Sequence, residues 1–150
     1  MDLLIKLYGD FPELRAAPRV VVRKPLGPEH RLVAEWAGAS FNPLWASEAQ
    51  AALANRPATL FIAQRDADIL GFCCYDATAR GFVGPIGVCD AARGQGVGGA
   101  LLLACLHDMR AAGYGYAVVG DVGAPEFFRR IAGAIEIPDS TPGLYAHLLR

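Results

Sequence analysis

The sequence predicts a mixed α/β domain, and three observations support this fold class. Short β-rich runs alternate with segments of helical hydrophobic spacing along the chain. Two β-rich runs, 59–64 and 69–76, are joined by the polar link Arg65-Asp66-Ala67-Asp68, which is typical of a hairpin. A strand–helix–strand unit over 82–120 implies at least one parallel strand pair. At 150 residues, the chain is expected to form a single domain over 1–150.

The elements are expected in the following order. Segment 3–8 is compatible with a short edge strand, and a strand at 20–22 precedes helices at 29–38 and 44–55. Leu32, Val33 and Trp36 are expected on one face of the first helix. After the hairpin come a turn, a strand, a helix, a strand, a helix and two strand-like segments, at 78–81, 82–88, 97–112, 116–120, 125–131, 134–137 and 144–149.

Composition excludes several functional classes. A net charge of −1 with 53% hydrophobic and 19% charged residues predicts a globular protein without a bulk field for nucleic acid or an anionic membrane. No apolar run reaches the ~18 residues of a membrane span, and the start does not resemble a signal peptide, so a cytoplasmic location is expected. The four cysteines show no C-x-x-C spacing, so no metal site is expected.

The segment Arg93-Gly94-Gln95-Gly96-Val97-Gly98-Gly99-Ala100 is the strongest functional signal. Its glycines let the backbone turn tightly and approach a ligand closely. The amides that open the following helix lack intrahelical partners and, with the helix dipole, form a cradle for phosphate. Arg93 adds a fixed positive charge. The segment therefore predicts a phosphorylated cofactor.

Two cofactor classes compete for this segment. Gly94, Gly96 and Gly99 match the dinucleotide pattern G-x-G-x-x-G, and Asp121 follows at the spacing of a ribose-binding acid. Against a nicotinamide cofactor, the pattern lies late in the chain, a loop over 89–93 separates it from the strand, and few residues follow Asp121. The pattern G-x-x-x-x-G-K-[ST] of ATP-type loops is missing.

The same residues resemble the GNAT superfamily of N-acetyltransferases. Arg93-Gly94-Gln95-Gly96-Val97-Gly98 is similar to the family's R/Q-x-x-G-x-G/A loop. Ile86-Gly87-Val88 resembles the end of its fourth strand, within a Gly84–Val88 stretch similar to a little-characterised subgroup, and Leu101-Leu102 resembles the apolar residues after the loop. Ala124-Pro125-Glu126-Phe127-Phe128 resembles its A-x-x-F-Y segment. In element order the resemblance covers about residues 20–150.

The resemblance implies a GNAT-like fold and acetyl-CoA as cofactor. The implied fold has a central, mostly antiparallel sheet, a parallel fourth and fifth strand splayed around the cofactor, and helices on both faces. The implied cofactor-binding residues are Ile86, Gly87, Val88, Arg93, Gly94, Gln95, Gly96, Val97, Gly98, Gly99 and Phe128. Gly84, Pro85 and Gly87 make a strand that pairs poorly, which suits a ligand at its edge. The alternative is a bulged edge strand without a ligand.

The sequence departs from the family at its catalytic positions, so the catalytic residues stay unassigned. Phe128 takes the place of the tyrosine that protonates the thiolate in many members, and it has no proton to donate. The usual glutamate early in the fourth strand is missing from 82–84. Trp45, Glu48 and Tyr145 are the candidate substrate-binding residues, and Tyr145 is a candidate replacement acid. The alternative is that these three side chains only pack or cover the surface.

The sequence leaves three hypotheses for the function of the protein. The first is an acetyl-CoA-dependent N-acetyltransferase that acts on an amine of a small molecule or peptide by direct attack. The second is a CoA-binding sensor or regulatory domain with little transferase activity, which the loss of catalytic groups motivates. The third is the nicotinamide-binding protein. Family habit also permits a homodimer.

Overall fold

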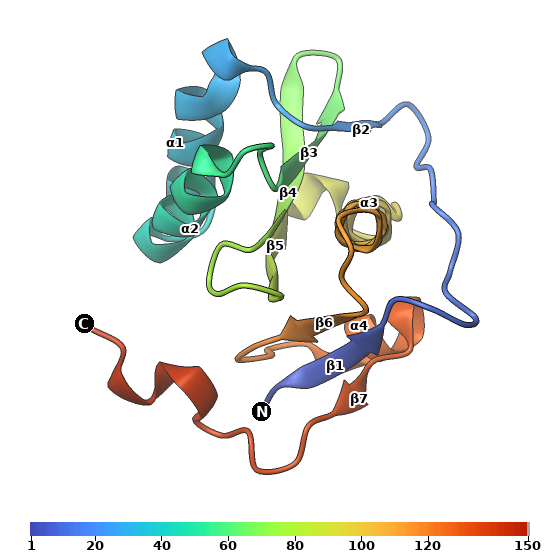
Figure 1. Cartoon of the computed structure of the whole chain (residues 1–150). Helices are drawn as coiled ribbons and strands as arrows, with labels where there is room; N and C mark the ends of the chain where they lie inside the picture. Colours follow the sequence, from blue (N-terminus) through green and yellow to red (C-terminus); the bar gives the residue numbers. More distant parts are fainter. Residues whose placement is uncertain (150) are drawn as a thin grey trace.

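The strands of the protein form two sheets, ordered β2-β3-β4-β5 and β6-β1-β7, in a computed structural model that describes residues 1–149 (Figure 1). The strands are β1 (Leu3–Lys6), β2 (Val21–Arg23), β3 (Leu60–Arg65), β4 (Asp68–Tyr75), β5 (Val83–Val88), β6 (Tyr116–Val119) and β7 (Ile135–Glu136). The α-helices are α1 (His30–Ser40), α2 (Pro43–Ala54), α3 (Val97–Ala111) and α4 (Pro125–Ala132). Three 3-10 turns complete the described elements: η1 (Gly27–Glu29), η2 (Asp90–Ala92) and η3 (Gly143–His147).

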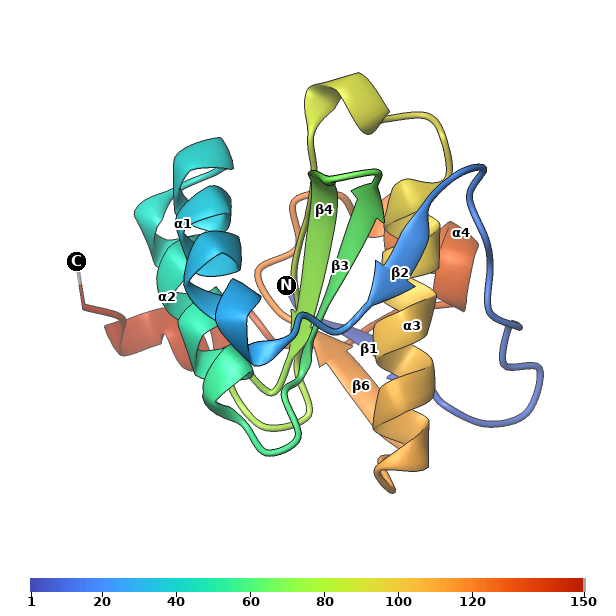
Figure 2. The ribbon, with the colours of Figure 1, turned by 90° about the horizontal axis from the view of Figure 1, so that it is seen from above.

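Helices cover both faces of the four-stranded sheet (Figure 2). Successive side chains of β4 alternate between the two faces, as the pleat of a strand requires. Phe72 packs in a core cluster with α1 and α2, whereas Cys73 packs in the second cluster with α3. The predicted hairpin of β3 and β4 is confirmed, with antiparallel pairing from Leu60 opposite Cys74 to Arg65 opposite Asp68.

The helix α3 is buried on almost all sides because it lies between the two sheets, with α4 against its first turn (Figure 1). Its buried residues run without a break from Gly99 to Leu106, and Met109 is also buried. A helix that is apolar all round needs such a central position. Among the described helices, none combines the length and hydrophobicity that crossing a membrane requires.

The two sheets meet where β5 and β6 begin to run side by side. A single parallel bridge joins Phe82 to Val118. Beyond it, β5 pairs with β4 and β6 pairs with β1, so the two parallel strands diverge. The predicted fold class is therefore confirmed, including the mostly antiparallel strands, the splayed parallel pair and the helices on both faces.

The predicted edge strand at 3–8 is instead the central strand of its sheet. In the structure β1 pairs antiparallel with β6 on one side, Leu3 opposite Val119, and with β7 on the other, Leu3 opposite Glu136. Leu3 and Ile5 are both 0% exposed, so their face of the strand supports the core. The expectation of an edge was wrong because β6 and β7 are remote in the sequence, and no local pattern reports such pairing.

The central position of β1 predicts that its buried side chains contribute strongly to stability. Leu3→Ala should lower the free energy of unfolding by about 2–5 kcal/mol, because it leaves a cavity in a buried site. Leu32→Ala is the matched control, since Leu32 is 60% exposed and does not share the buried face of α1 with Val33 as expected. Urea unfolding followed by circular dichroism measures both changes. Equal losses for the two variants would contradict the central role of β1.

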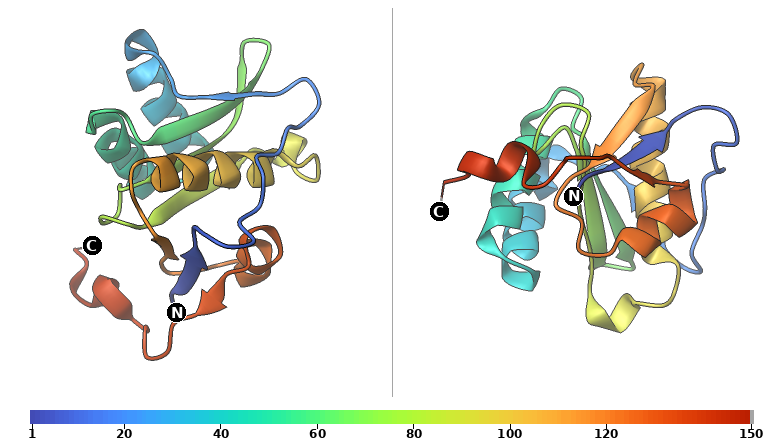
Figure 3. Two further views of the ribbon diagram at one scale, coloured as in Figure 1. Left: turned by 45° about the vertical axis from the view of Figure 1, so that its right-hand side comes forward. Right: turned by 90° about the horizontal axis from the view of Figure 1, so that it is seen from below.

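The prediction of a last strand at 144–149 is also wrong. The structure has the 3-10 turn η3 there, with a local bond from the Leu148 amide to the Tyr145 carbonyl at 3.1 Å. Leu144 and Leu148 are 50% and 53% exposed, so the segment lacks the buried face that would anchor a strand. Figure 3 shows the segment leaving β7 and extending toward α2. This course brings Tyr145 to the cleft described below.

Candidate active site

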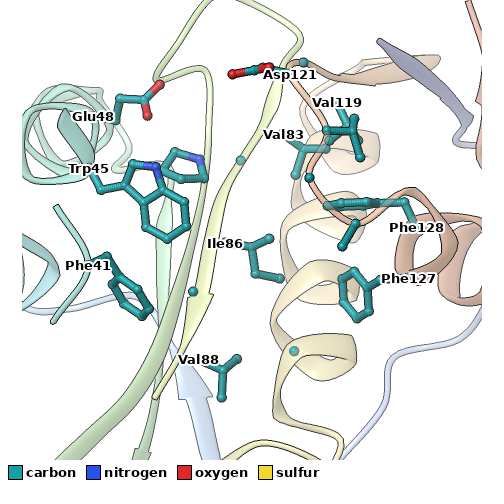
Figure 4. Close-up of a pocket in the computed structure, with 18 of the residues that line it drawn as sticks. Phe41, Trp45, Glu48, Val83, Ile86, Val88, Val119, Asp121, Phe127 and Phe128 are labelled. Atoms are coloured by element: carbon teal, nitrogen blue, oxygen red, sulfur yellow. The ribbon is translucent and has the colours of Figure 1, made fainter. Parts of the chain in front are cut away.

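A cleft of about 1170 Å³ opens between the diverging strands β5 and β6 (Figure 4). Its lining comes from both strands, the glycine-rich turn, the start of α3, α4, α2 and η3. The volume exceeds the roughly 300–1,000 Å³ of pockets for drug-sized ligands, so it suits a large cofactor together with a second molecule. Every candidate cofactor- or substrate-binding residue from the sequence lines this cleft, except Gln95.

The glycine-rich turn leads from η2 into α3 and faces the cleft. Gly94 and Gly96 have φ angles of +77° and +81°, which only glycine adopts readily. Gly96 is the N-cap of α3, and no side chain caps this helix end. A Cβ at either glycine would find no atom within 4 Å, so the protein itself does not fill the space beside the turn. The amides of the first helical turn can therefore bind an anion there.

The side chain of Gln95 supports the turn from outside the cleft. Its Oε1 accepts a hydrogen bond from Arg65 Nη2 at 2.9 Å, and its Nε2 donates to the Ala91 carbonyl at 3.1 Å. These bonds tie the turn to β3 and to η2. For this residue, the backbone amide is the group that can take part in cofactor binding.

Three arginines line the cleft, two at the glycine-rich turn and one on α4, whose Phe127 and Ile131 lie near Gly98 and Gly99. Arg93 is in the turn itself, its side chain 67% exposed, with Nε 3.4 Å from Asp90 Oδ1. Arg15 and Arg130 also line the cleft, and Arg15 Nη1 lies 3.7 Å from the position a Cβ would take on Gly99. The sequence analysis missed Arg15 and Arg130 because they come from the 7–20 connection and from α4, and no local motif links those segments.

The strand β5 presents one edge to the cleft and one face to α2. Its pairing with β4 places Gly87 opposite Phe72 and Ile86 opposite Cys73. A Cβ on Gly87 would lie 2.6 Å from the Phe41 ring and 2.8 Å from the Trp45 ring. Glycine is therefore required at position 87 because two aromatic side chains pack directly on the strand, a reason that the sequence did not reveal.

Two phenylalanines of α4 close the opposite side of the cleft (Figure 4). Phe128 is 6% exposed and belongs to the core cluster around α3. Phe127 is half-buried, with its ring 3.4 Å from the position a Cβ would take on Gly98. Neither ring carries a hydroxyl, so this wall can pack against a ligand but cannot protonate one.

Trp45 and Glu48 extend from α2 toward the cleft (Figure 4). The residue before the helix, Asn42, is its N-cap, and its Oδ1 accepts a hydrogen bond from the Trp45 amide at 3.0 Å. Glu48 Oε1 accepts a hydrogen bond from the Thr78 hydroxyl in the turn before β5. The bond connects α2 to that turn and fixes the direction of the carboxylate.

Tyr145 reaches the cleft from η3 and lies against the end of β6. A Cβ on Gly120 would lie 2.5 Å from the Tyr145 hydroxyl and 2.9 Å from the Phe82 ring. The pKa of the Tyr145 phenol is raised above its usual value by burial and then by the charges of Glu48, Asp2 and Asp121, against the effect of a hydrogen bond with Thr78. The phenol is therefore protonated at neutral pH and can donate a proton.

Asp121 follows β6 at the end of the cleft where Glu48 lies. Figure 4 shows Asp121 and Glu48 on opposite sides of this end, with Val88, which leads into the glycine-rich turn, at the other. A ribose-binding acid has to lie near the glycine-rich turn that holds the pyrophosphate. The position of Asp121 thus disfavours the nicotinamide alternative.

Comparisons with known structures agree with this geometry. An N-acetyltransferase related to GCN5 from Sphaerobacter thermophilus matches with a TM-score of 0.69 and 24% identity, over 89% of this chain and 47% of that one. One from Kribbella flavida matches with a TM-score of 0.60 and 18% identity, over 87% and 52%. The chain thus spans about half the length of these structural relatives.

A GNAT family acetyltransferase from Brucella melitensis, solved in complex with acetyl-CoA, matches with a TM-score of 0.54 and 26% identity, over 74% of this chain and 80% of that one. The comparison with curated proteins found no match. The model of the acetyltransferase (GNAT) family matches residues 30–134, which include β3, β4, β5, the glycine-rich turn, α3 and α4. This chain belongs to the acetyltransferase (GNAT) family.

Proposed function

We propose that the protein transfers an acetyl group from acetyl-CoA to an amine by direct attack, as a single domain over residues 1–150. The observation that supports this most is the cleft itself, with a helix N-terminus and three arginines at one end and two diverging strands along its length. Family membership and the Brucella melitensis relative solved with acetyl-CoA support the choice of cofactor. Residue 150 lies outside the described residues.

In this proposal, the amides of Gly94 to Gly99 and the guanidinium of Arg93 hold the pyrophosphate of the cofactor. The main-chain groups of Ile86, Gly87 and Val88 hold its extended arm, because the edge of β5 that faces the cleft carries no strand within residues 1–149. Phe128 packs against the arm from α4. When bound, acetyl-CoA supplies an acetyl group activated as a thioester.

The remaining chemistry falls to residues at the far end of the cleft. Glu48 accepts a proton from the incoming ammonium, and the neutral nitrogen then forms a bond to the acetyl carbon as the carbon–sulfur bond breaks with its electron pair on sulfur. Tyr145 donates its phenolic proton to that sulfur and regains one from water. The nitrogen loses its second proton to water, and Glu48 also releases the proton that it accepted to water, so that one proton is released per turnover. Trp45 forms the wall beside the amine.

A CoA-binding sensor with little transferase activity is the second candidate. The observation that favours it is Phe128, a core residue without the hydroxyl that many family members carry at this position. Titration calorimetry with acetyl-CoA, with NADH as the control, tests cofactor binding for both candidates. A following assay of thiol release with a panel of amines separates them, because steady turnover with any amine excludes the sensor.

Arg93→Ala provides a further prediction. The variant should bind acetyl-CoA more weakly by about 1.5–3 kcal/mol, since it loses a charge-assisted contact with phosphate. We expect the lower part of this range because the side chain is 67% exposed. Arg31→Ala is the control, because the Arg31 side chain is 90% exposed and pairs with Glu35 on α1, away from the cleft. Calorimetry should show a larger dissociation constant for the first variant alone, and equal constants would remove Arg93 from the cofactor site.

The acceptor is proposed to be an amine of a small molecule or peptide. The cytoplasmic location and the homodimer stay predictions of the sequence.

A further inference from the structure

The two ends of the cleft carry side chains of opposite charge. Its basic lining residues are Arg15, Arg93 and Arg130, and they gather around the glycine-rich turn and the face of α4 that packs on it. Its acidic lining residues are Glu48 and Asp121, which lie at the opposite end and on opposite sides of the gap (Figure 4). We call this second end the acidic end. A ligand with negative and positive groups at its two ends would match the cleft.

The carboxylates of the acidic end are not neutralised by basic side chains. The ion pairs formed among residues 1–149 include neither Glu48 nor Asp121. Both carboxylates, together with Asp2, act on the phenol of Tyr145, so their charges converge on one place. Opposite charge is the interaction that such a place offers a ligand, and it repels a carboxylate.

An apolar wall lies beside these charges. Phe41 and Trp45 contact each other with ring centroids 5.0 Å apart, and Phe41 also packs 5.8 Å from the buried ring of Phe72. These contacts, and the close packing of both rings on Gly87, fix the wall in place. The lining near it is otherwise mostly small or apolar, with Leu44, Ala51, Ala77 and Leu148. Such a wall binds hydrocarbon or aromatic groups.

We propose that the acceptor is a primary amine carried on an apolar or aromatic body, with no carboxylate beside the amine. The ammonium lies between Glu48 and Asp121, and the body lies against Trp45 and Phe41. α-Amino acids are disfavoured because their carboxylate would face both acidic side chains. Short amines are disfavoured because they leave the aromatic wall uncovered. This inference rests on the proposed transferase function and narrows its substrate class.

Two matched pairs of acceptors test the proposal. Phenethylamine and phenylalanine differ only in the carboxylate, and phenethylamine and ethylamine differ only in the aromatic body. We expect kcat/KM for phenethylamine to exceed the values for phenylalanine and for ethylamine by about tenfold or more. Repulsion between the carboxylate of phenylalanine and one acidic side chain can cause a difference of this size, and so can the loss of ring contacts in ethylamine. Phenylalanine or ethylamine turning over as well as phenethylamine would overturn the proposal.

Variants connect the preference to the named residues. Glu48→Gln should reduce the preference for phenethylamine over phenylalanine about tenfold, because it removes one of the two repelling charges. Glu35→Gln, on the exposed surface of α1, should leave the preference unchanged. Trp45→Leu should reduce the preference for phenethylamine over ethylamine, mainly by raising KM for phenethylamine. Unchanged preferences in Glu48→Gln and Trp45→Leu would also overturn the proposal.

Binding measurements keep this test separate from the test of the transferase itself. Calorimetry of phenethylamine and phenylalanine with the CoA-loaded protein should show the same preference without any turnover. Acetyl-CoA binding together with a preference for phenylalanine would overturn the acceptor class and leave the proposed function intact. A protein that does not bind acetyl-CoA would lose the proposed function, and the acceptor class with it.

Discussion

Gly96→Val should abolish detectable binding of acetyl-CoA. The N-cap glycine of α3 has a φ of +81° and faces open space in the cleft. A branched side chain there would fill the space in which the phosphates approach the helical amides. Acetyl-CoA at 100 times its dissociation constant should stabilise the wild-type protein by ~2.7 kcal/mol, and the variant should show none of this stabilisation. Thermal unfolding with and without acetyl-CoA measures the difference.

Gly113→Val is the matched control for this experiment. Gly113 follows the other end of α3, has a φ of +102°, and likewise has no atom within 4 Å of a Cβ position. Valine is strained at both positions, by about 1–2 kcal/mol for a left-handed conformation, so both variants should lose stability without ligand. Only the variant at position 96 should lose the response to acetyl-CoA. An unchanged response at position 96 would mean that the pyrophosphate binds elsewhere.

Tyr145→Phe should lower kcat by about 100-fold, because loss of a general acid costs at least this factor. The affinity for acetyl-CoA should change little, since the hydroxyl lies at the end of the cleft away from the glycine-rich turn. The pKa of the phenol is raised, so the acid is protonated through neutral pH and its contribution is lost only as pH rises through that pKa. The wild-type rate should therefore hold at moderately alkaline pH, and its fall above the usual tyrosine pKa should be missing in the variant.

Tyr8→Phe is the control for this second experiment. The Tyr8 hydroxyl is exposed and shares a hydrogen bond of 2.8 Å with the Tyr116 hydroxyl. Tyr8 is not among the residues that line the cleft. Steady-state kinetics of the two variants, across pH, should separate a proton donor from a tyrosine that only packs. A kcat unchanged in Tyr145→Phe would show that the thiolate leaves without a proton from this residue.

Local patterns predicted the elements that depend on neighbouring residues. The glycines from Gly94 to Gly99 predicted a turn and a helix start, and the structure has Gly96 as the N-cap of α3. The polar link at 65–68 predicted the hairpin of β3 and β4 with its antiparallel pairing. In both cases the backbone preference of a few adjacent residues decides the conformation.

Features that depend on distant residues could not be predicted in the same way. The edge assignment of 3–8 was wrong because β6 and β7 come from the other end of the chain. Arg15 and Arg130 enter the cleft only because the tertiary structure brings the 7–20 connection and α4 to the glycine-rich turn. The family's A-x-x-F-Y pattern drew attention to Phe128, whereas the structure adds its neighbour Phe127, whose ring packs near Gly98.

The central place of β1 has a consequence for the order of folding. The four-stranded sheet forms largely from segments close in sequence, whereas the sheet β6-β1-β7 needs residues near Leu3 to meet those near Val119 and Glu136. Contacts of such long sequence separation carry a large loop-closure entropy and slow the folding rate. One wall of the cleft should therefore assemble early and the other late. Until the second sheet forms, the side of α3 that faces β1 and β6 should stay uncovered, and exposed apolar surface of this kind favours aggregation.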